Sequence, residues 1–372
     1  MSKKSQFAVI AVFLTFLVVF FAASLILPDR DFSERENRFL EGRPKFSFEA
    51  LFSGKYIAEY ETYSTDQFPF RDGWITLKAR VERILGKQEN NGVYLGEGDT
   101  LIEPFHAPET DVIQNNMTAV NKLAEGTEVP VYFALIPGKA EVWADRMSAL
   151  TPNDSQKDLI DAAYALSQAE TIDIHAALSA HRDEALYYRT DHHWTTLGAY
   201  YGAAAILDAM DRGSTPLADY SPRIVSDSFY GTTYSSSGFS WIAPDEMRVY
   251  VEPSEALTIT NYYSGAPEAG LLYDESYLGK KDKYAMFFGG NTPLLTVDTG
   301  MEGERLLILR DSYTDCMAPF LFDAFSEIHL IDLRYYRASI LQYIEENAID
   351  RVLVLYNVDN FSTDTNFFLM GR

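Results

Sequence analysis

The stretch RLLILRDSY, residues 305–313, decides the fold of this 372-residue chain. Its apolar centre is typical of a buried strand, and Ser312 lies at the carboxyl end of that strand, just before a segment with a helical pattern. In open α/β sheets, ligands bind at this edge. A serine on a strand-to-helix turn exposes its hydroxyl oxygen, and the start of the helix favours developing negative charge there. Taken alone, such a serine is more often an N-cap than a nucleophile.

Apolar runs and helical patterns alternate on both sides of this stretch. Predicted strands occupy residues 129–137, 171–174, 283–291, 327–333 and 351–357. Predicted helices occupy residues 154–169, with Asp154 as N-cap, and 197–210, with Thr195 or Thr196 as N-cap. The alternation predicts an α/β fold in which helices cover both faces of a mostly parallel sheet.

The N-terminus carries an uncharged apolar run from Phe7 to Leu27, which follows Lys3 and Lys4. As a helix it would rise about 31 Å, enough to cross a bilayer core. The lysines place the N-terminal end in the cytoplasm and the rest of the chain outside. We favour an uncleaved signal anchor over a cleaved signal peptide, for which residues 22–24 offer small side chains. A buried core helix is disfavoured because the run is apolar on every face.

Three segments are expected along the chain. Residues 1–28 form the transmembrane signal anchor, and residues 29–90 form a juxtamembrane stalk and a helical segment that breaks at Pro69. Residues 91–372 form the α/β domain, which includes an irregular, partly β insertion at about 211–283. The insertion is rich in Ser, Thr, Tyr, Gly and Pro, the usual material of binding loops.

Composition narrows the class of protein. Hydrophobic residues make up 47% of the chain and charged residues 23%, as expected of a folded globular protein. The net charge of −23 speaks against a nucleic-acid partner and against docking on an anionic membrane face. A single cysteine, Cys316, excludes an intramolecular disulfide.

The second informative stretch is TDHHWT, residues 190–195, in the loop that leads into a predicted helix. Asp191 and His193 are spaced so that the carboxylate can hold one imidazole nitrogen while the other faces a nucleophile. His192 points elsewhere if the loop is extended, where it either packs or touches substrate, and Trp194 either walls the site or packs beneath it. Asp191 and the two histidines could instead hold a metal, but no Cys cluster or HExxH helix adds further ligands, and we expect none. A polar knot that caps the helix is a further alternative.

The two stretches complement one another. Ser312 at one strand end and the Asp191–His193 pair at another supply the three parts of a hydrolase or acyl-transfer site. Their order along the chain is Asp, His, Ser. Catalytic triads recur in several orders, so this order does not argue against one.

Several motifs together resemble the DHHW family of bacterial surface proteins, which is similar to the alginate O-acetylation proteins of the SGNH hydrolase-like superfamily. They are the N-terminal anchor, FPFRD (68–72), NGVY (91–94), TDHHWT (190–195) and RDSY (310–313). The resemblance covers most of the chain after about Glu34 and implies an SGNH hydrolase-like three-layer fold in permuted order. It implies that Asp191 orients His193, that His193 is the general base, and that Ser312 attacks. An acetyl group on the serine would then pass to a sugar hydroxyl or to water.

The chain departs from the superfamily pattern near the serine. Arg310 stands where the usual Gly-Asp-Ser block has its glycine. The N–H of Ser312 is one expected oxyanion donor, and Gly290 and Asn291 in FGGN are candidates for the other. Lys139 in IPGK resembles a family position and is a candidate substrate-binding residue. Together with Lys139, two arginines could make the groove locally basic: Arg189 and Arg310.

The sequence therefore predicts a membrane-anchored, extracytoplasmic enzyme that moves or removes acetyl groups on a cell-envelope polysaccharide. The family resemblance implies an integral membrane O-acyltransferase partner that delivers the acyl group, and we expect no cofactor. A sugar-binding or scaffold protein of an envelope assembly is the alternative, supported by the aromatic, Ser-rich stretch from Phe229 to Trp241. A metal-dependent hydrolase is a third hypothesis.

Overall fold

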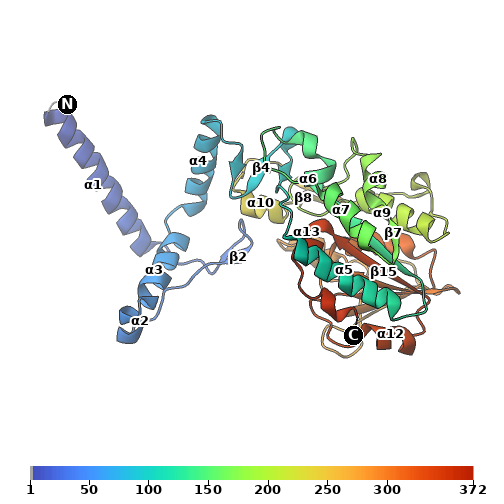
Figure 1. Cartoon of the computed structure of the whole chain (residues 1–372). Helices are drawn as coiled ribbons and strands as arrows, with labels where there is room; N and C mark the ends of the chain where they lie inside the picture. Colours follow the sequence, from blue (N-terminus) through green and yellow to red (C-terminus); the bar gives the residue numbers. More distant parts are fainter. Residues whose placement is uncertain (1–2, 372) are drawn as a thin grey trace. The chain divides into compact units, whose positions relative to one another are not determined.

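The computed structural model describes residues 3–371, which divide into two compact units (Figure 1). The first unit comprises residues 3–90 together with Gly238–Ser240. The second comprises Asn91–Ser237 and residues 241–371, and it carries the residues of TDHHWT and of RDSY. Each unit is described by itself.

The first unit begins with α1 (Lys3–Ile26), most of whose side chains are exposed. Among the described residues, α1 is the one helix that is long and apolar enough to cross a membrane. The segment after it contains short strands and three helices. These are β1 (Phe32–Ser33), β2 (Arg38–Phe39), α2 (Phe48–Phe52), α3 (Lys55–Asp66), α4 (Arg71–Ile84) and β3 (Glu89–Asn90). The predicted break at Pro69 is confirmed, because α3 ends before it and α4 begins after it.

Within residues 91–371, the second unit has an eight-stranded sheet in the order β11-β10-β12-β14-β13-β15-β6-β7. The five strands from β14 to β7 are parallel, and the three at the other edge pair antiparallel. The strands are β6 (Val131–Ile136), β7 (Glu170–Ile172), β10 (Thr258–Asn261), β11 (Glu268–Ala269), β12 (Leu294–Asp298), β13 (Arg305–Arg310), β14 (Glu327–Ile331) and β15 (Arg351–Asn357). The prediction of a mixed α/β fold with a mostly parallel sheet is confirmed.

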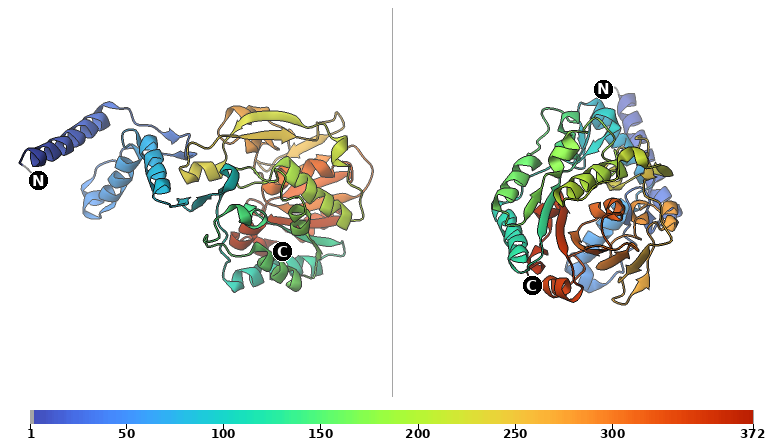
Figure 2. Two further views of the ribbon diagram at one scale, coloured as in Figure 1. Left: turned by 90° about the horizontal axis from the view of Figure 1, so that it is seen from above. Right: turned by 90° about the vertical axis from the view of Figure 1, so that its right-hand side faces the viewer.

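Helices cover both faces of this sheet, as expected when parallel strands are buried on both sides. Figure 2 shows helices on both faces of the sheet. Along β6, Phe133 and Leu135 join the core formed with α5, α7, α12 and α13, whereas Tyr132, Ala134 and Ile136 join the core formed with α8, α9 and α11. The helices are α5 (Thr110–Glu125), α6 (Lys139–Val142), α7 (Gln156–Leu166), α8 (Ile174–Ser179), α9 (Thr196–Ala209), α10 (Thr232–Ser237), α11 (Tyr313–Met317), α12 (Ile340–Glu346) and α13 (Val358–Thr363).

The region at 211–283 is built from several short elements. An antiparallel ribbon pairs β8 (Arg223–Phe229) with β9 (Asp245–Val249), and α10 lies between these strands in the sequence. Strands β10 and β11 extend the main sheet at its antiparallel edge. The region therefore contributes to the sheet as well as to loops.

Two local predictions are wrong. Residues 283–291 form no strand: Tyr284–Met286 is a 3₁₀ turn, and Phe288, Gly289 and Gly290 follow with φ of 55°, 79° and 93°, values that a strand does not adopt. Asp154 is not the N-cap of α7, because Ser155 Oγ accepts from Asp158 N and the Asp154 carboxylate accepts from Ala107 N instead. The predicted cap of α9 is confirmed at Thr195, which accepts from Gly198 N.

Candidate active site

Ser312 stands at the carboxyl end of a central strand. β13 lies between β14 and β15, and its residues Leu306–Leu309 are fully buried. The strand ends at Arg310, and Ser312 is the N-cap residue of α11. The predicted strand-to-helix turn is confirmed.

The carboxylate of Asp311 anchors this turn. Its Oδ1 accepts from Tyr313 N at 3.0 Å, and its Oδ2 accepts from Asn357 N at 2.8 Å and from Asn360 Nδ2 at 2.7 Å. The turn after β13 is thereby tied to the end of β15. Burial raises the pKa of Asp311, although these hydrogen bonds act against it. The sequence analysis did not identify the hydrogen bonds that join Asp311 to Asn357 and Asn360. These residues lie at or just after the ends of two predicted strands and therefore share one edge of the sheet.

The loop that carries TDHHWT is a hairpin closed by backbone hydrogen bonds. Tyr187 and Trp194 form an antiparallel bridge, and Tyr188 N donates to His193 O at 3.2 Å. Thr190 donates through N and Oγ1 to the buried carboxylate of Asp245, at 2.7 and 2.6 Å. These bonds fix the backbone on which the acid and the two histidines stand.

The structure brings Asp191, His193 and Ser312 into one hydrogen-bonded chain. His193 Nδ1 lies 2.6 Å from Asp191 Oδ1, and His193 Nε2 lies 2.8 Å from Ser312 Oγ, across 119 positions of sequence. Asp191 and His193 are buried, while Ser312 is half-buried. With Asp191 ionised, the proton is assigned to Nδ1, which leaves Nε2 free to accept the hydroxyl proton.

The surroundings of Asp191 keep its carboxyl ionised. Its Oδ1 also accepts from His193 N at 3.0 Å, and its Oδ2 accepts from Thr232 N and Oγ1 at 2.8 and 3.1 Å. Burial raises the pKa of Asp191, but the neighbouring imidazoles of His192 and His193 and the hydrogen bonds outweigh it, so the pKa lies well below its usual value. Gly231 allows this packing, because a Cβ there would lie 2.2 Å from Asp191.

His192 lies beside the chain of hydrogen bonds and is not part of it. Its Nδ1 shares a hydrogen bond of 2.7 Å with Thr232 Oγ1, and 41% of its side chain is exposed. Because the Thr232 hydroxyl donates to Asp191, the Nδ1 of His192 is the donor to Thr232. Burial of the inner part of the ring and the imidazole of His193 lower the pKa of His192.

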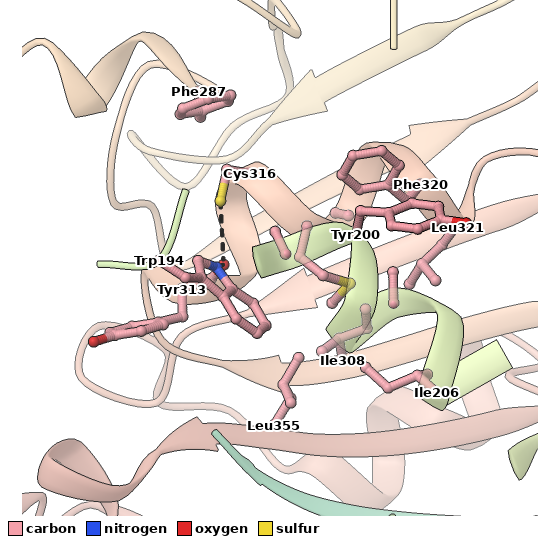
Figure 3. Close-up of a cluster of buried hydrophobic side chains, with 14 of the residues drawn as sticks. Trp194, Tyr200, Ile206, Phe287, Ile308, Tyr313, Cys316, Phe320, Leu321 and Leu355 are labelled. Carbon is pink, nitrogen blue, oxygen red and sulfur yellow. Dashed lines mark hydrogen bonds between the residues drawn. The ribbon is translucent and has the colours of Figure 1, made fainter. Parts of the chain in front are cut away.

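Trp194 packs beneath the site. Its side chain is fully buried, and its Nε1 donates to Tyr313 O at 2.9 Å. It lies next to Tyr313 and Cys316 in the core below the start of α11 (Figure 3). Of the two readings of Trp194, the structure favours the packing role.

The three cations expected to make the groove basic contact other groups of the fold, so a basic groove stays a prediction that these contacts do not support. Arg310 is fully buried, and its Nη1 lies 2.8 Å from Asp315 Oδ1. Arg189 Nε lies 3.1 Å from Asp245 Oδ1. Lys139 is buried too, whereas 30% of the Arg189 side chain is exposed.

Lys139 holds two backbone carbonyls rather than facing solvent. Its Nζ donates to Leu101 O at 2.6 Å and to Tyr188 O at 3.2 Å, so it joins the strand β5 (Leu101–Ile102) to the TDHHWT hairpin. Burial lowers the pKa of Lys139 to about 8, although the carboxylates of Asp191 and Asp245 pull it upward. Its contacts do not support the predicted role in substrate binding.

The candidate oxyanion residues Gly290 and Asn291 have other partners. Gly290 N donates to Phe287 O at 3.2 Å, and the Asn291 amide oxygen accepts from Arg334 Nη2 at 3.4 Å. Their role stays a prediction that these bonds do not support. Tyr284, in the same stretch, is the residue that reaches the site: its hydroxyl donates to Ser312 O at 3.0 Å. Sequence reasoning missed it.

Asp191, His192 and His193 offer one ligand atom each within 4.8 Å of one another, so this group could hold a metal ion. Both ring nitrogens of His193 already serve Asp191 and Ser312. A metal bound at this ring would replace one of those two hydrogen bonds. The geometry therefore favours proton transfer between His193 and Ser312.

The residues of this site lie in segments that match a known family. The sequence pattern of the family described as DHHW protein matches residues 36–125 and 105–331. The chain belongs to the DHHW family. A DHHW family protein from Eubacterium siraeum has a similar crystal structure, with a TM-score of 0.64 and 25% identity over 76% of this chain and 95% of that one.

Two further relatives extend the comparison of this DHHW protein. Bacillus cereus PatB1, solved with a sulfonyl adduct, shares the fold with a TM-score of 0.63 at 21% identity, over 75% of this chain and 98% of PatB1. The probable alginate O-acetylase AlgJ of Pseudomonas putida is 27% identical over 177 residues, which are 44% of this chain and 46% of AlgJ. The chain spans about half the length of the curated relatives it matches.

Proposed function

We propose that this DHHW protein is an extracytoplasmic O-acetyltransferase or acetylesterase that acts on a cell-envelope polysaccharide. The observation that carries the proposal is the continuous hydrogen-bonded chain from Asp191 through His193 to Ser312 at the carboxyl edge of a parallel sheet. Such an edge is where α/β folds place reacting groups. Relatives named probable alginate O-acetylase support acetyl transfer as the class of reaction. The names of those relatives specify alginate, whereas the proposal for this chain specifies only a cell-envelope polysaccharide.

The side chains of Ser312, His193 and Asp191 can carry out each step of acetyl transfer. Ser312 Oγ attacks the carbonyl carbon of an acetyl donor, and His193 Nε2 takes the hydroxyl proton while Asp191 stabilises the imidazolium through Nδ1. Collapse of the tetrahedral adduct breaks the bond to the leaving group, which receives the proton from His193. A sugar hydroxyl or water then gives its proton to His193 and attacks the acetyl-serine, and Ser312 regains its proton. The N–H of Ser312, at the start of α11, is the expected oxyanion donor.

We also propose a fold class for the second unit and a location for the protein. The unit is an SGNH hydrolase-like domain in permuted order, in which the Asp-x-His pair precedes the serine, and Arg310 is a departure from the usual Gly-Asp-Ser block. α1 is an uncleaved signal anchor that holds the protein in the cell membrane with the α/β unit outside. A membrane-bound O-acyltransferase that supplies the acetyl group is the expected partner.

A serine-reactive fluorophosphonate probe tests the proposal on the full-length protein in detergent. We expect labelling of the wild type and hydrolysis of an aryl acetate ester, with both lost in Ser312→Ala because the nucleophile is removed. Ser326→Ala is the matched control, since Ser326 is also half-buried but precedes β14 at the other end of the sheet.

Three results would decide against this function or against Ser312 as its nucleophile. A wild-type protein that is neither labelled nor able to release acetate would favour the sugar-binding or scaffold alternative. Activity that a chelator abolishes would favour a metal-dependent hydrolase built on Asp191, His192 and His193. Labelling that survives in Ser312→Ala would place the nucleophile elsewhere.

A further inference from the structure

We propose that Tyr284 is a positioning residue that sets the ring plane of His193 against Ser312. The proposal rests on the proposed function, because it concerns proton transfer between these two side chains. It starts from one contact: the rings of Tyr284 and His193 are nearly parallel, with centroids 3.8 Å apart and an interplanar angle of 9°. The same tyrosine donates its hydroxyl to Ser312 O at 3.0 Å.

The two hydrogen bonds of His193 leave one motion unrestrained. They hold Nδ1 against Asp191 and Nε2 against Ser312, but both hydrogen bonds can bend while the ring tilts by rotating about the Cβ–Cγ bond. The second torsion of a histidine side chain is soft. Because the lone pair of Nε2 lies in the ring plane, such a tilt would swing it away from Ser312 Oγ. A flat surface against the ring face blocks the tilt.

Tyr284 provides such a surface, and its own position is fixed. It is buried in the 3₁₀ turn Tyr284–Met286, where Asp274 N donates to Met286 O at 2.8 Å. Phe287, which follows the turn, packs its ring against that of Tyr284 at 5.3 Å. The ring of His192 also lies 3.8 Å from that of His193 but is tilted by 36°, so Tyr284 is the better-matched face.

The stack also suits the charge that forms during the reaction. When His193 accepts the proton of Ser312 it becomes a cation, and the face of a tyrosine ring carries negative electrostatic potential that attracts cations. The ring thus favours the protonated base as well as its orientation. Removing the hydroxyl alone should cost little, whereas removing the ring should slow acylation of Ser312.

Two variants separate the ring from the hydroxyl. Tyr284→Phe keeps the stack, and Tyr284→Leu keeps an apolar side chain without the ring face. With an aryl acetate and the full-length protein in detergent, we expect kcat of Tyr284→Leu to fall about tenfold or more, with KM nearly unchanged. Tyr284→Phe should stay within about threefold of the wild type. The rate of fluorophosphonate labelling should follow the same order.

Controls keep the test decisive. Tyr273→Leu removes another tyrosine ring that packs on Phe287, at 5.8 Å, and should leave kcat nearly unchanged. If Tyr284→Leu does not fold, as judged by thermal unfolding, Tyr284→Met replaces it as a flexible ring-less variant with the same expected loss.

Failure of the Tyr284 proposal and failure of the proposed function give different results. Full activity in the ring-less variant, or an equal loss in Tyr284→Phe, would overturn the proposal while leaving the catalytic serine intact. A wild-type protein without labelling or ester hydrolysis would overturn the proposed function, and this inference with it. A lower kcat in Tyr284→Leu, together with a kcat near that of the wild type in Tyr284→Phe, would support the proposed role of Tyr284.

Discussion

Two neighbouring histidines of the DHHW motif have different surroundings at the residue scale. His193 is buried and bridges Asp191 and Ser312, whereas His192 keeps 41% of its side chain exposed and binds Thr232. The segment bends at these residues, so the two imidazole rings lie side by side with centroids 3.8 Å apart, and their different hydrogen-bond partners account for the division. The shared element is Thr232, whose hydroxyl touches both Asp191 and His192. His192 is therefore expected to support the geometry of the acid rather than to transfer a proton.

Replacing each histidine by alanine tests this division. His193→Ala should lower kcat/KM on an aryl acetate by about 100-fold or more, because the general base is lost. His192→Ala should lower it by only a few-fold, about what one lost hydrogen bond to the Asp191 cluster costs. Circular dichroism checks that both variants fold. Complete and equal loss in two folded variants would contradict the assignment.

Buried charges join elements of the second unit. Arg310 at the end of β13 pairs with Asp315 in α11, and burial raises the pKa of Asp315 to about 7 even though Arg310 acts against it. Breaking such a buried pair by removing one partner usually costs about 3–5 kcal/mol. Lys139, at the start of α6, joins β5 to the TDHHWT hairpin in a similar way. These contacts hold the turn and the hairpin that carry the candidate catalytic side chains.

Lys139 should make the stability of the protein depend on pH. Its pKa is about 8 in the folded protein and near 10.5 when unfolded, so between these values the unfolded chain binds more protons and stability rises with pH. Relative to Lys139→Met, the free energy of unfolding of the wild type should therefore increase by as much as about 3 kcal/mol from pH 7.5 to 10.5. Denaturant unfolding at both pH values measures this difference.

The matched control is Lys157→Met, which removes a lysine of α7 paired with Asp161. Hydrogen bonding to Asp161 raises the pKa of Lys157, so the corresponding difference should not grow with pH. A wild type that gains no stability over Lys139→Met as the pH rises would show that the Lys139 amine is not destabilised by burial.

At the scale of the whole molecule, charge and hydrophobicity are segregated along the chain. The net charge is −23, yet α1 is apolar between its N-terminal lysines and Ile26. The candidate catalytic residues all lie in the second unit, and α1 lies in the first. The helix that could cross a membrane and the candidate catalytic residues therefore lie in separate parts of the described chain.

Deleting residues 2–28 should move the protein from the membrane fraction to the soluble fraction. Hydrolysis of a soluble aryl acetate should stay within about twofold of the full-length protein, because that substrate needs no membrane partner. Fractionation and the ester assay measure both effects. Mass spectrometry of the full-length protein gives the control: an N-terminus created by cleavage near residues 22–24 would show a signal peptide instead of an anchor.

The sequence by itself determined the class of the fold and three candidate catalytic residues. Apolar runs, N-caps and the proline break are local signals, so β13, β15 and the cap at Thr195 could be predicted from neighbours in the chain. Asp191 and His193 were identifiable because their spacing is short. Tertiary structure alone decided what lies against them. Arg310 and Lys139 turned inward, and Tyr284 reached His193 from a distant segment, because burial and face-to-face contact depend on packing between elements that no local pattern encodes.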